Sequence, residues 1–337
     1  MEIKCPKCGE ALELPEEAVG AKVQCPFCGD TFIGPLVLKP CGESKPQVRI
    51  SPFERYLSMF RNIQDDNSGR RALGAILSDK KVIKCIRNCE VPIIVGCETD
   101  GNPRIIDLAD ASKGDEYACM TVVGPTGCGK SEFGKCVITT KMLKPQVQCF
   151  VASVMGHILH VLNEGFFPGV TVFSGEEELK NAIKVVCSIV KRRMECASKR
   201  PFHRILFIID DCLDMFLDAD DLNNLRYICI NSKQSGVHVL ALAQGWVDNN
   251  DMKKLSAVFG RKICFPCWEP EYFFESRNQR QFLQAVRDCA TGQLAYTDAE
   301  DEGSALRAVY VDNDDYSSLV TFMKNFSATY GVKFDSQ

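Results

Sequence analysis

Apolar residues fall in short runs that alternate with longer amphipathic stretches along much of the chain. The runs Cys119–Val123, Ile205–Ile209 and Val237–Ala243 have the length of buried strands. A helical pattern follows the first run through about Lys141, and a longer one covers residues 176–198. Strands alternating with helices are typical of a parallel sheet covered by helices. The pattern therefore predicts the α/β fold class, with a mostly parallel sheet flanked by helices.

A glycine-rich loop follows the first of these strands and has the pattern G-x4-G-K-S. Between a strand and a helix, this pattern binds nucleotide phosphates, because its glycines let backbone N–H groups turn inward and the helix adds its dipole. Lys130 would reach the β- and γ-phosphates, and Ser131 would bind Mg²⁺. The predicted ATP-binding residues are Gly124, Pro125, Thr126, Gly127, Cys128, Gly129, Lys130 and Ser131.

Polar side chains end the other two strands. The second strand leads into Asp210-Asp211, the arrangement of a Walker B strand. Asp210 would then hold Mg²⁺, and Asp211 would orient or deprotonate the attacking water. The alternative is a solvated acidic turn. Gln244 ends the third strand, where a RecA-type sheet would place it to sense the γ-phosphate or to position water. Because the carboxyl ends of parallel strands meet at one edge, we expect the ligand site there.

The amino-terminal segment carries two C-P-x-C-G motifs in the spacing C-x2-C-x16-C-x2-C, formed by Cys5, Cys8, Cys25 and Cys28. This spacing predicts a structural Zn²⁺ site in a small zinc ribbon. Redox thiols or a metal-free tail are the alternatives. Acidic side chains outnumber basic ones over residues 1–34, so a protein partner fits the ribbon better than direct contact with DNA. The segment resembles amino-terminal zinc ribbons of bacterial proteins.

The 337 residues allow about two domains. We expect a zinc ribbon over 1–34 and a linker with three prolines over 35–50. An amino-terminal subdomain of the ATPase would cover 51–115, and the ATPase domain itself would cover 116–337.

Composition narrows the class of protein. A net charge of -4 excludes a protein that is basic over its whole surface, but three local basic clusters remain, at 80–87, 191–193 and 253–262. The 19 cysteines are an odd number and follow no signal peptide, which favours a reducing cytoplasm. No apolar run reaches the roughly 18 residues of a membrane span. Cys264 and Cys267 lack a second pair and are predicted to be core thiols, whereas Cys128 is predicted to be sensitive to oxidation.

The sequence resembles the FtsK/SpoIIIE motor ATPases, within the FtsK/HerA group. The likeness rests on VGCETDGNPRIIDL at 95–108, GPTGCGKSE at 124–132, LFIIDD at 206–211 and SGVHVLALAQ at 235–244. It implies a RecA-like ATPase that assembles into a homo-oligomeric ring, usually a hexamer. Such rings move double-stranded DNA or, in secretion relatives, polypeptide. Ring ATPases commonly use an arginine from the neighbouring subunit. Arg261 and Arg277 fall on family arginine positions, and ordinary ion pairing is the alternative for each.

Three departures from the family pattern stand out. Asp211 replaces the usual Glu, Gly245-Trp246 follows Gln244 in place of Arg-Pro, and residues 152–155 lack a charged Asp-Pro-Lys. We therefore expect a cytoplasmic, bacterial, ATP-driven translocase of double-stranded DNA, with a zinc ribbon that binds a protein partner. A secretion ATPase acting on protein and a non-motor ATP switch are the alternatives.

Overall fold

The computed structural model describes residues 2–4, 11–13, 22–24, 31–33, 71–110, 118–144, 146–154, 158, 169–196, 202–210, 217–244, 255–267, 270, 280–298 and 303–311. The chain divides into two compact units, one with Met1–Ile50 and Ser327–Gln337 and the other with Ser51–Phe326.

The amino-terminal unit contains two short antiparallel hairpins. Strand β1 (Glu2–Lys4) pairs with β2 (Ala11–Glu13), and β3 (Lys22–Gln24) pairs with β4 (Thr31–Ile33). In the sequence, one C-P-x-C-G motif separates the two strands of each hairpin. The four cysteines themselves lie outside the described residues.

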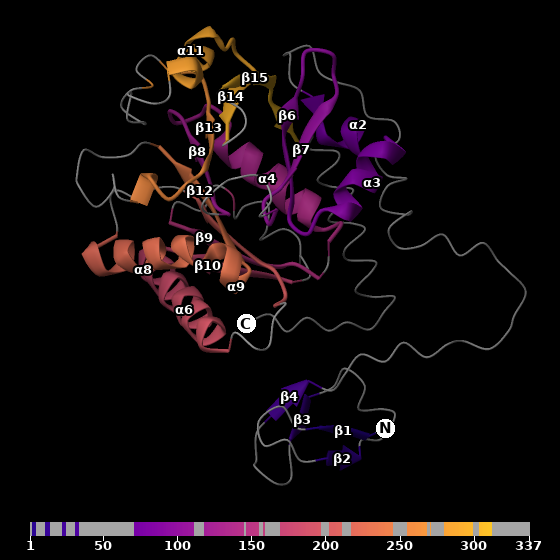
Figure 1. Ribbon diagram of the computed structural model, residues 1–337, viewed down its shortest axis with the longest axis vertical. Coiled ribbons are helices and arrows are strands. Elements are labelled where there is room, and N and C mark those ends of the chain that lie inside the picture. The colour runs from indigo at the N-terminus through magenta and orange to yellow at the C-terminus, as the bar shows by residue number, and fades with distance from the viewer. Residues whose placement is uncertain are drawn as a thin grey trace, which may run out of the picture. The chain divides into compact units, whose positions relative to one another are not determined.

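The second unit is built on a ten-stranded mixed sheet (Figure 1). Neighbouring strands are parallel from β10 to β13 and antiparallel from β13 to β7. The α/β prediction is confirmed, and the antiparallel part is an addition to it. In order across the sheet, the strands are β10 (Val170–Ser174), β9 (Gln148–Ser153), β11 (Ile205–Asp210), β12 (Val237–Ala243), β8 (Met120–Val123), β13 (Arg261–Cys264), β14 (Gln293–Thr297), β15 (Ser304–Arg307), β6 (Pro92–Cys97) and β7 (Pro103–Asp107).

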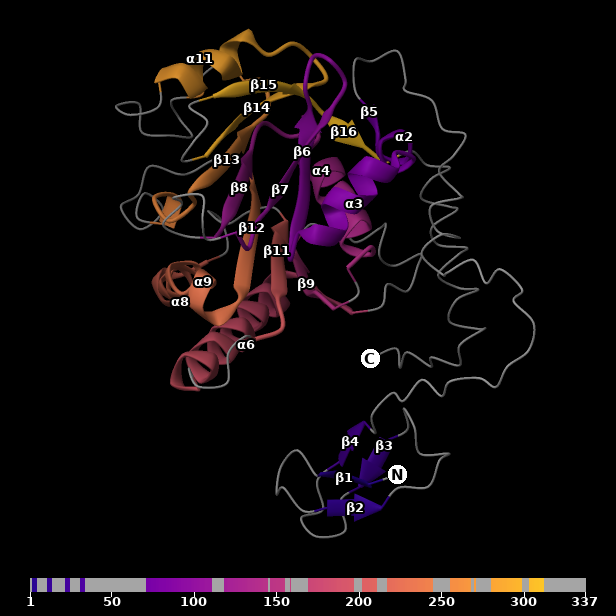
Figure 2. The same ribbon diagram turned by 45° about the vertical axis from the view of Figure 1, so that its right-hand side comes forward.

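Helices cover both faces of this sheet, as Figure 2 shows. One face packs against α6 (Glu176–Glu195), α8 (Ala219–Ile230), α9 (Ser232–Ser235) and α11 (Arg280–Asp288). The other packs against α4 (Lys130–Lys141), α2 (Leu73–Leu77) and α3 (Lys80–Asn88), beside the short parallel pair β5 (Arg71–Ala72) and β16 (Val309–Tyr310). Every residue of β11 and β12 is buried, because helices cover both of their faces.

Local sequence explains one feature in each of two helices, the buried face of α6 and the end of α9. α6 buries Leu179, Ile183, Val186 and Val190, whose spacing of three or four residues forms one apolar stripe. α9 ends at Gly236, whose φ of +68° makes it a left-handed cap, a conformation that glycine adopts without steric cost.

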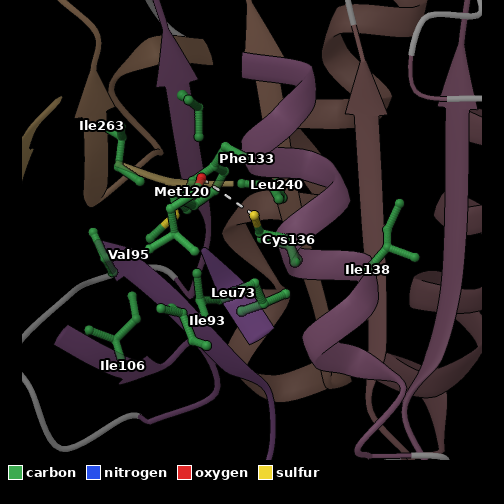
Figure 3. Packing of buried hydrophobic residues seen from close by; sticks show 14 of the residues in the cluster. Leu73, Ile93, Val95, Ile106, Met120, Phe133, Cys136, Ile138, Leu240 and Ile263 are labelled. Atoms are coloured by element: carbon green, nitrogen blue, oxygen red, sulfur yellow. Dashed lines mark hydrogen bonds between the residues drawn. The ribbon is translucent and has the colours of Figure 1, made fainter. Parts of the chain in front are cut away.

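The core beneath α4 holds the start of that helix against the sheet. Figure 3 shows Phe133 and Cys136 of α4 pointing toward Met120 of β8 and Leu240 of β12. The Cys136 thiol also donates to the Val309 carbonyl oxygen at 3.4 Å. Burying a side chain of the size of Phe133 contributes about 1.5–3 kcal/mol, so this contact anchors the helix that follows the phosphate loop.

None of the helices in the described part of the chain combines the length and the apolar character needed to cross a membrane.

Candidate functional site

The predicted phosphate loop joins the carboxyl end of β8 to the first turn of α4. Gly127 and Gly129 have φ angles of +81° and +116°, a region that side-chain-bearing residues rarely adopt. Gly129 is also the residue that caps α4. The first backbone N–H groups of a helix have no acceptor within it, so this turn presents donors and a positive dipole end to an anion.

Phe265, the residue directly after the neighbouring strand β13, supports this loop. A Cβ atom at Gly124 would lie 2.9 Å from the Phe265 Cβ, and one at Gly129 would lie 3.2 Å from the Phe265 ring. The Phe265 N–H donates to the Val123 carbonyl oxygen at 2.9 Å. Sequence reasoning missed Phe265 because only the pairing of β13 with β8 brings it to the loop.

Lys130 is buried inside the loop. Its ammonium donates to the carbonyl oxygens of Gly124 at 2.9 Å and Pro125 at 3.0 Å. Only 5% of the residue is exposed. An ammonium has three N–H donors, so a further one is available for a phosphate oxygen. The loop thus holds a cation at its centre with neutral acceptors, which suits a polyanionic ligand.

Asp210 ends β11 and is fully buried. One carboxylate oxygen accepts from the Ser131 hydroxyl at 3.3 Å. The other accepts from the Ser153 hydroxyl at 3.3 Å and from the Ile158 N–H at 3.2 Å. The structure therefore brings together Ser131 and Asp210, the two residues predicted to bind Mg²⁺, and their oxygens are the ligand type that this ion prefers.

Ser153 is a site residue that sequence reasoning did not select. It ends β9, which pairs with β11 so that Ser153 lies opposite Asp210. The only signal in the sequence is its place at a strand end, where the family pattern has charged residues. Its hydroxyl fixes the orientation of the Asp210 carboxylate.

Gln244 reaches the phosphate loop through Thr126. The Thr126 hydroxyl donates to the Gln244 side-chain oxygen at 3.1 Å. Strand β12 lies between β8 and β11. Gln244, which follows β12, therefore lies between the phosphate loop after β8 and Asp210 at the end of β11. Both groups in this contact are exposed to solvent, which leaves them accessible to a bound nucleotide.

Arg261 has a different place from the one predicted. It begins β13, opposite Met120 at the start of β8, and so lies at the other end of the strand from the loop. Its guanidinium is fully buried and donates to the carbonyl oxygens of Asp107 at 3.1 Å and Asp110 at 3.5 Å. In this structure the guanidinium ties β13 to the end of β7, a placement that does not favour the predicted role as a trans arginine.

Asp107, from the segment that precedes the loop in the family pattern, also has a structural role. Its carboxylate accepts from the backbone N–H groups of Glu90 at 2.6 Å, Val91 at 2.8 Å and Ala109 at 3.0 Å. These bonds join the start of β6 to the end of β7. Asp211 and Arg277, the remaining predicted catalytic residues, lie outside the described residues.

His238, part of the family-like segment on β12, is a buried neutral side chain. Burial lowers its pKa to about 4. Its Nδ1 lies 3.2 Å from the Ala118 carbonyl oxygen, just before β8. The histidine thus links β12 from within the core to the residue pair that leads into β8.

A cavity of about 250 Å³ adjoins the phosphate loop. Its lining combines loop and helix residues with Phe265 after β13, the turn before β14 and strand β16, namely Gly127, Glu132, Phe265, Gly292, Val309 and Tyr310. Cys128 also lines it, and burial raises the pKa of that thiol, so it stays uncharged at neutral pH. A partly apolar cavity beside a phosphate site is suited to the base and sugar of a nucleotide.

The basic clusters differ in their surroundings. Arg193 donates to the carbonyl oxygens of His203 at 2.9 Å and Ser235 at 2.8 Å, and so supports the fold. Lys253 and Lys254 lie outside the described residues. On α3, by contrast, the cationic side chains all lie on the exposed face, opposite buried apolar residues. This face consists of Lys80, Lys81, Lys84 and Arg87.

No family model and no curated protein matches the chain. Solved structures do match. The cytoplasmic domain of the type VII secretion ATPase EccC from Thermomonospora curvata is 16% identical, with a TM-score of 0.55 over 69% of this chain and 31% of that one. The pCW3 conjugation coupling protein TcpA, solved with ATPγS, is 14% identical, with a TM-score of 0.54 over 72% of each chain. EssC from Geobacillus thermodenitrificans is 14% identical, with a TM-score of 0.51 over 74% of this chain and 51% of that one.

These matches show the fold of the second unit. It is the RecA-like fold of P-loop ATPases, and the matched structures belong to the FtsK/SpoIIIE family that the sequence resembles. The matched region spans less than half of the EccC chains, at 31% and 42% of their length.

Proposed function

We propose that this protein is an ATP-hydrolysing motor of the FtsK/SpoIIIE type. The observation that carries the proposal is the meeting of three groups at one sheet edge. Lys130 lies within its loop, Ser131 contacts Asp210 at 3.3 Å, and Thr126 contacts Gln244 at 3.1 Å. Phosphate binding, Mg²⁺ binding and water positioning need these three kinds of group side by side.

Each residue has a separate task in the proposed reaction. The amides of the loop and Lys130 bind and orient the phosphates, with the base in the adjoining cavity. Ser131 and Asp210 would hold Mg²⁺, which neutralises charge on the phosphate oxygens when bound. Ser153 keeps the Asp210 carboxylate in place. Asp211 would activate the water and Gln244 would orient it.

A ring of identical subunits, with six as the expected number, is part of this proposal. Such a ring places each nucleotide near a neighbouring subunit, which supplies an arginine to the developing charge. Because Arg261 is buried, Arg277 is the remaining candidate for that arginine. Negative-stain electron microscopy with ATPγS tests the assembly, and monomers under all conditions would contradict it.

We further propose that the polymer moved by this motor is double-stranded DNA. The exposed cations of α3 support this, since phosphate backbones are bound by clustered Lys and Arg. The conjugation coupling protein TcpA shares the fold. A protein substrate is the second candidate, because secretion ATPases share it too, and EccC has been solved with a signal sequence peptide. A bacterial cytoplasm is the proposed location in either case.

Double-stranded DNA is expected to raise the ATPase rate, and the effect should weaken as salt rises. The Lys81→Gln/Lys84→Gln variant should keep its basal rate and bind DNA more weakly, with the log–log salt slope smaller by about 0.9 for each lost phosphate contact. ATPase assays and DNA-binding titrations over a range of salt concentrations measure both quantities.

A matched control is the Lys180→Gln/Lys184→Gln variant on α6, an amphipathic helix elsewhere on the sheet. It should behave like the unmodified protein. Absence of any DNA effect on the rate at low salt would exclude the DNA proposal, and stimulation by a polypeptide in its place would support the protein candidate.

We propose that Cys5, Cys8, Cys25 and Cys28 bind one structural Zn²⁺, and that the resulting ribbon binds a protein partner. The support is that each C-x2-C pair occupies the segment between two paired antiparallel strands. Zinc binding would supply folding energy that so small a unit cannot obtain from its core.

Protein purified without chelator is therefore expected to contain about one zinc per chain. The Cys5→Ser/Cys8→Ser variant should lose the metal, and proteases should then cleave residues 1–34 faster. Cys85→Ser, which changes an exposed thiol of α3, is the control. Zinc well below stoichiometry in the unmodified protein, measured by atomic emission, would contradict the site.

A further inference from the structure

Cys264 and Cys267 place two thiols beside each other at the carboxyl end of β13. Their sulfur atoms are 3.9 Å apart, within hydrogen-bonding range for thiols. Cys264 is fully buried and held between two strands, opposite Val123 of β8 and Ala295 of β14. Cys267 follows the strand and is half-buried. One thiol of the pair is therefore fixed in the sheet, and the other belongs to a partly buried residue just after the strand.

Phe265, which lies between the two cysteines in the sequence, is the residue that supports the phosphate loop. Phe265 follows Cys264 directly, and its ring and Cβ lie against the positions of Gly129 and Gly124. The loop thiol Cys128 is close as well, since its sulfur would lie 2.7 Å from a Cβ atom at Gly124. Phe265 thus connects the thiol pair to the phosphate loop, because it is joined to Cys264 in the chain and packs against the loop glycines.

We propose that Cys264 and Cys267 are a site of oxidative modification, which takes a small disulfide such as oxidised glutathione and weakens nucleotide binding when the two sulfurs are joined. The proposal rests on the ATP-binding function proposed above for the adjoining loop. It differs from the sequence-based expectation, in which the pair was structural and Cys128 was the thiol sensitive to oxidation.

The reaction is a thiol–disulfide exchange in two steps. Cys267 loses its proton and attacks one sulfur of the small disulfide, which forms a mixed disulfide and releases one small thiol. Cys264 then loses its proton and attacks the Cys267 sulfur, which forms the internal disulfide and releases the second small thiol. The protein loses two electrons and two protons, and the small disulfide gains them.

Relative burial and hydrogen bonding assign these roles. Cys267 is the less buried residue of the two. The hydrogen bond to Cys267 and burial both raise the pKa of Cys264, so Cys264 is the weaker first nucleophile. Its proton leaves only after Cys267 has become part of the mixed disulfide.

Closing the bond moves the segment that supports the loop. The sulfurs must approach from 3.9 Å to about 2.05 Å. The backbone of Cys264 is held in place, because β8 and β14 pair with it on both sides. The displacement therefore falls on Phe265, Pro266 and Cys267, and Pro266 cannot absorb it through its φ angle. Phe265 then shifts against the glycines of the loop, whose shape sets the positions of the phosphate-binding amides.

The test compares ATPγS binding by the reduced full-length protein with binding after treatment with oxidised glutathione. We expect the dissociation constant to rise about tenfold, which corresponds to about 1.4 kcal/mol. Mass spectrometry of the tryptic peptide 263–277, which contains only these two cysteines, should show a loss of two hydrogens in step with the loss of affinity. Reduction with dithiothreitol should reverse both changes.

Two variants separate this pair from the other thiols. Cys267→Ser should bind ATPγS normally and lose the response to oxidation, whereas Cys85→Ser, an exposed thiol on α3, should keep it. A disulfide without a change in affinity, no disulfide in the peptide, or an undiminished response in Cys267→Ser would each overturn the proposal. A reduced protein that does not bind ATPγS would contradict the proposed ATP-binding function itself.

Discussion

Replacing Lys130 with alanine is expected to abolish ATP hydrolysis while the sheet remains folded. The ammonium is the only cation placed at the centre of the loop among the residues described, and two carbonyl oxygens fix its position. Removing a preorganised charge from such a site typically costs about 10²–10³ in turnover, or about 2.7–4 kcal/mol. Steady-state release of inorganic phosphate measures the effect.

The Lys180→Ala variant is the matched control for this experiment. Lys180 pairs with Glu176 on α6, at 2.7 Å, and surface pairs of this kind contribute little to stability. It should hydrolyse ATP at the normal rate. If Lys130→Ala also keeps its rate, the assignment of the phosphate loop is wrong. Circular dichroism of both variants confirms that any loss of rate does not come from unfolding.

The second large effect is expected for Asp210→Asn. This change keeps the size of the side chain and its capacity to accept from the Ile158 N–H, so the buried site should stay folded. It removes the negative charge opposite Ser131, which is the charge proposed to hold Mg²⁺. Turnover should fall by about 100-fold or more, and the Mg²⁺ concentration needed for half-maximal rate should rise.

Asp220→Asn, in the exposed first turn of α8, serves as the control for the same chemical change. It should leave both the rate and the Mg²⁺ dependence unaltered. A normal Mg²⁺ dependence in Asp210→Asn would mean that Asp210 does not bind the ion. A loss of rate at all Mg²⁺ concentrations together with loss of the thermal unfolding transition would show that its role is structural.

The places of Arg261, Ser153 and Phe265 could not be predicted from the sequence, for one shared reason. Arg261 falls on a family arginine position, yet it lies at the end of β13 that is remote from the loop, where the guanidinium donates to carbonyl oxygens at the end of β7 and just after it. Ser153 and Phe265 have no motif, yet both lie at the site because β9 pairs with β11 and β13 pairs with β8. In each case the neighbouring strand decides the role of the residue.

The sequence alone determined the features that depend on residues close together in the chain. Glycines in the loop allow positive φ angles, apolar runs form buried strands, and amphipathic spacing forms α6, all through local contacts and burial. The tertiary structure alone decided the strand order, which places β12 between β8 and β11 and brings Gln244 beside Thr126. The reason is that pairing between distant strands depends on packing over the whole sheet, and no short pattern encodes it.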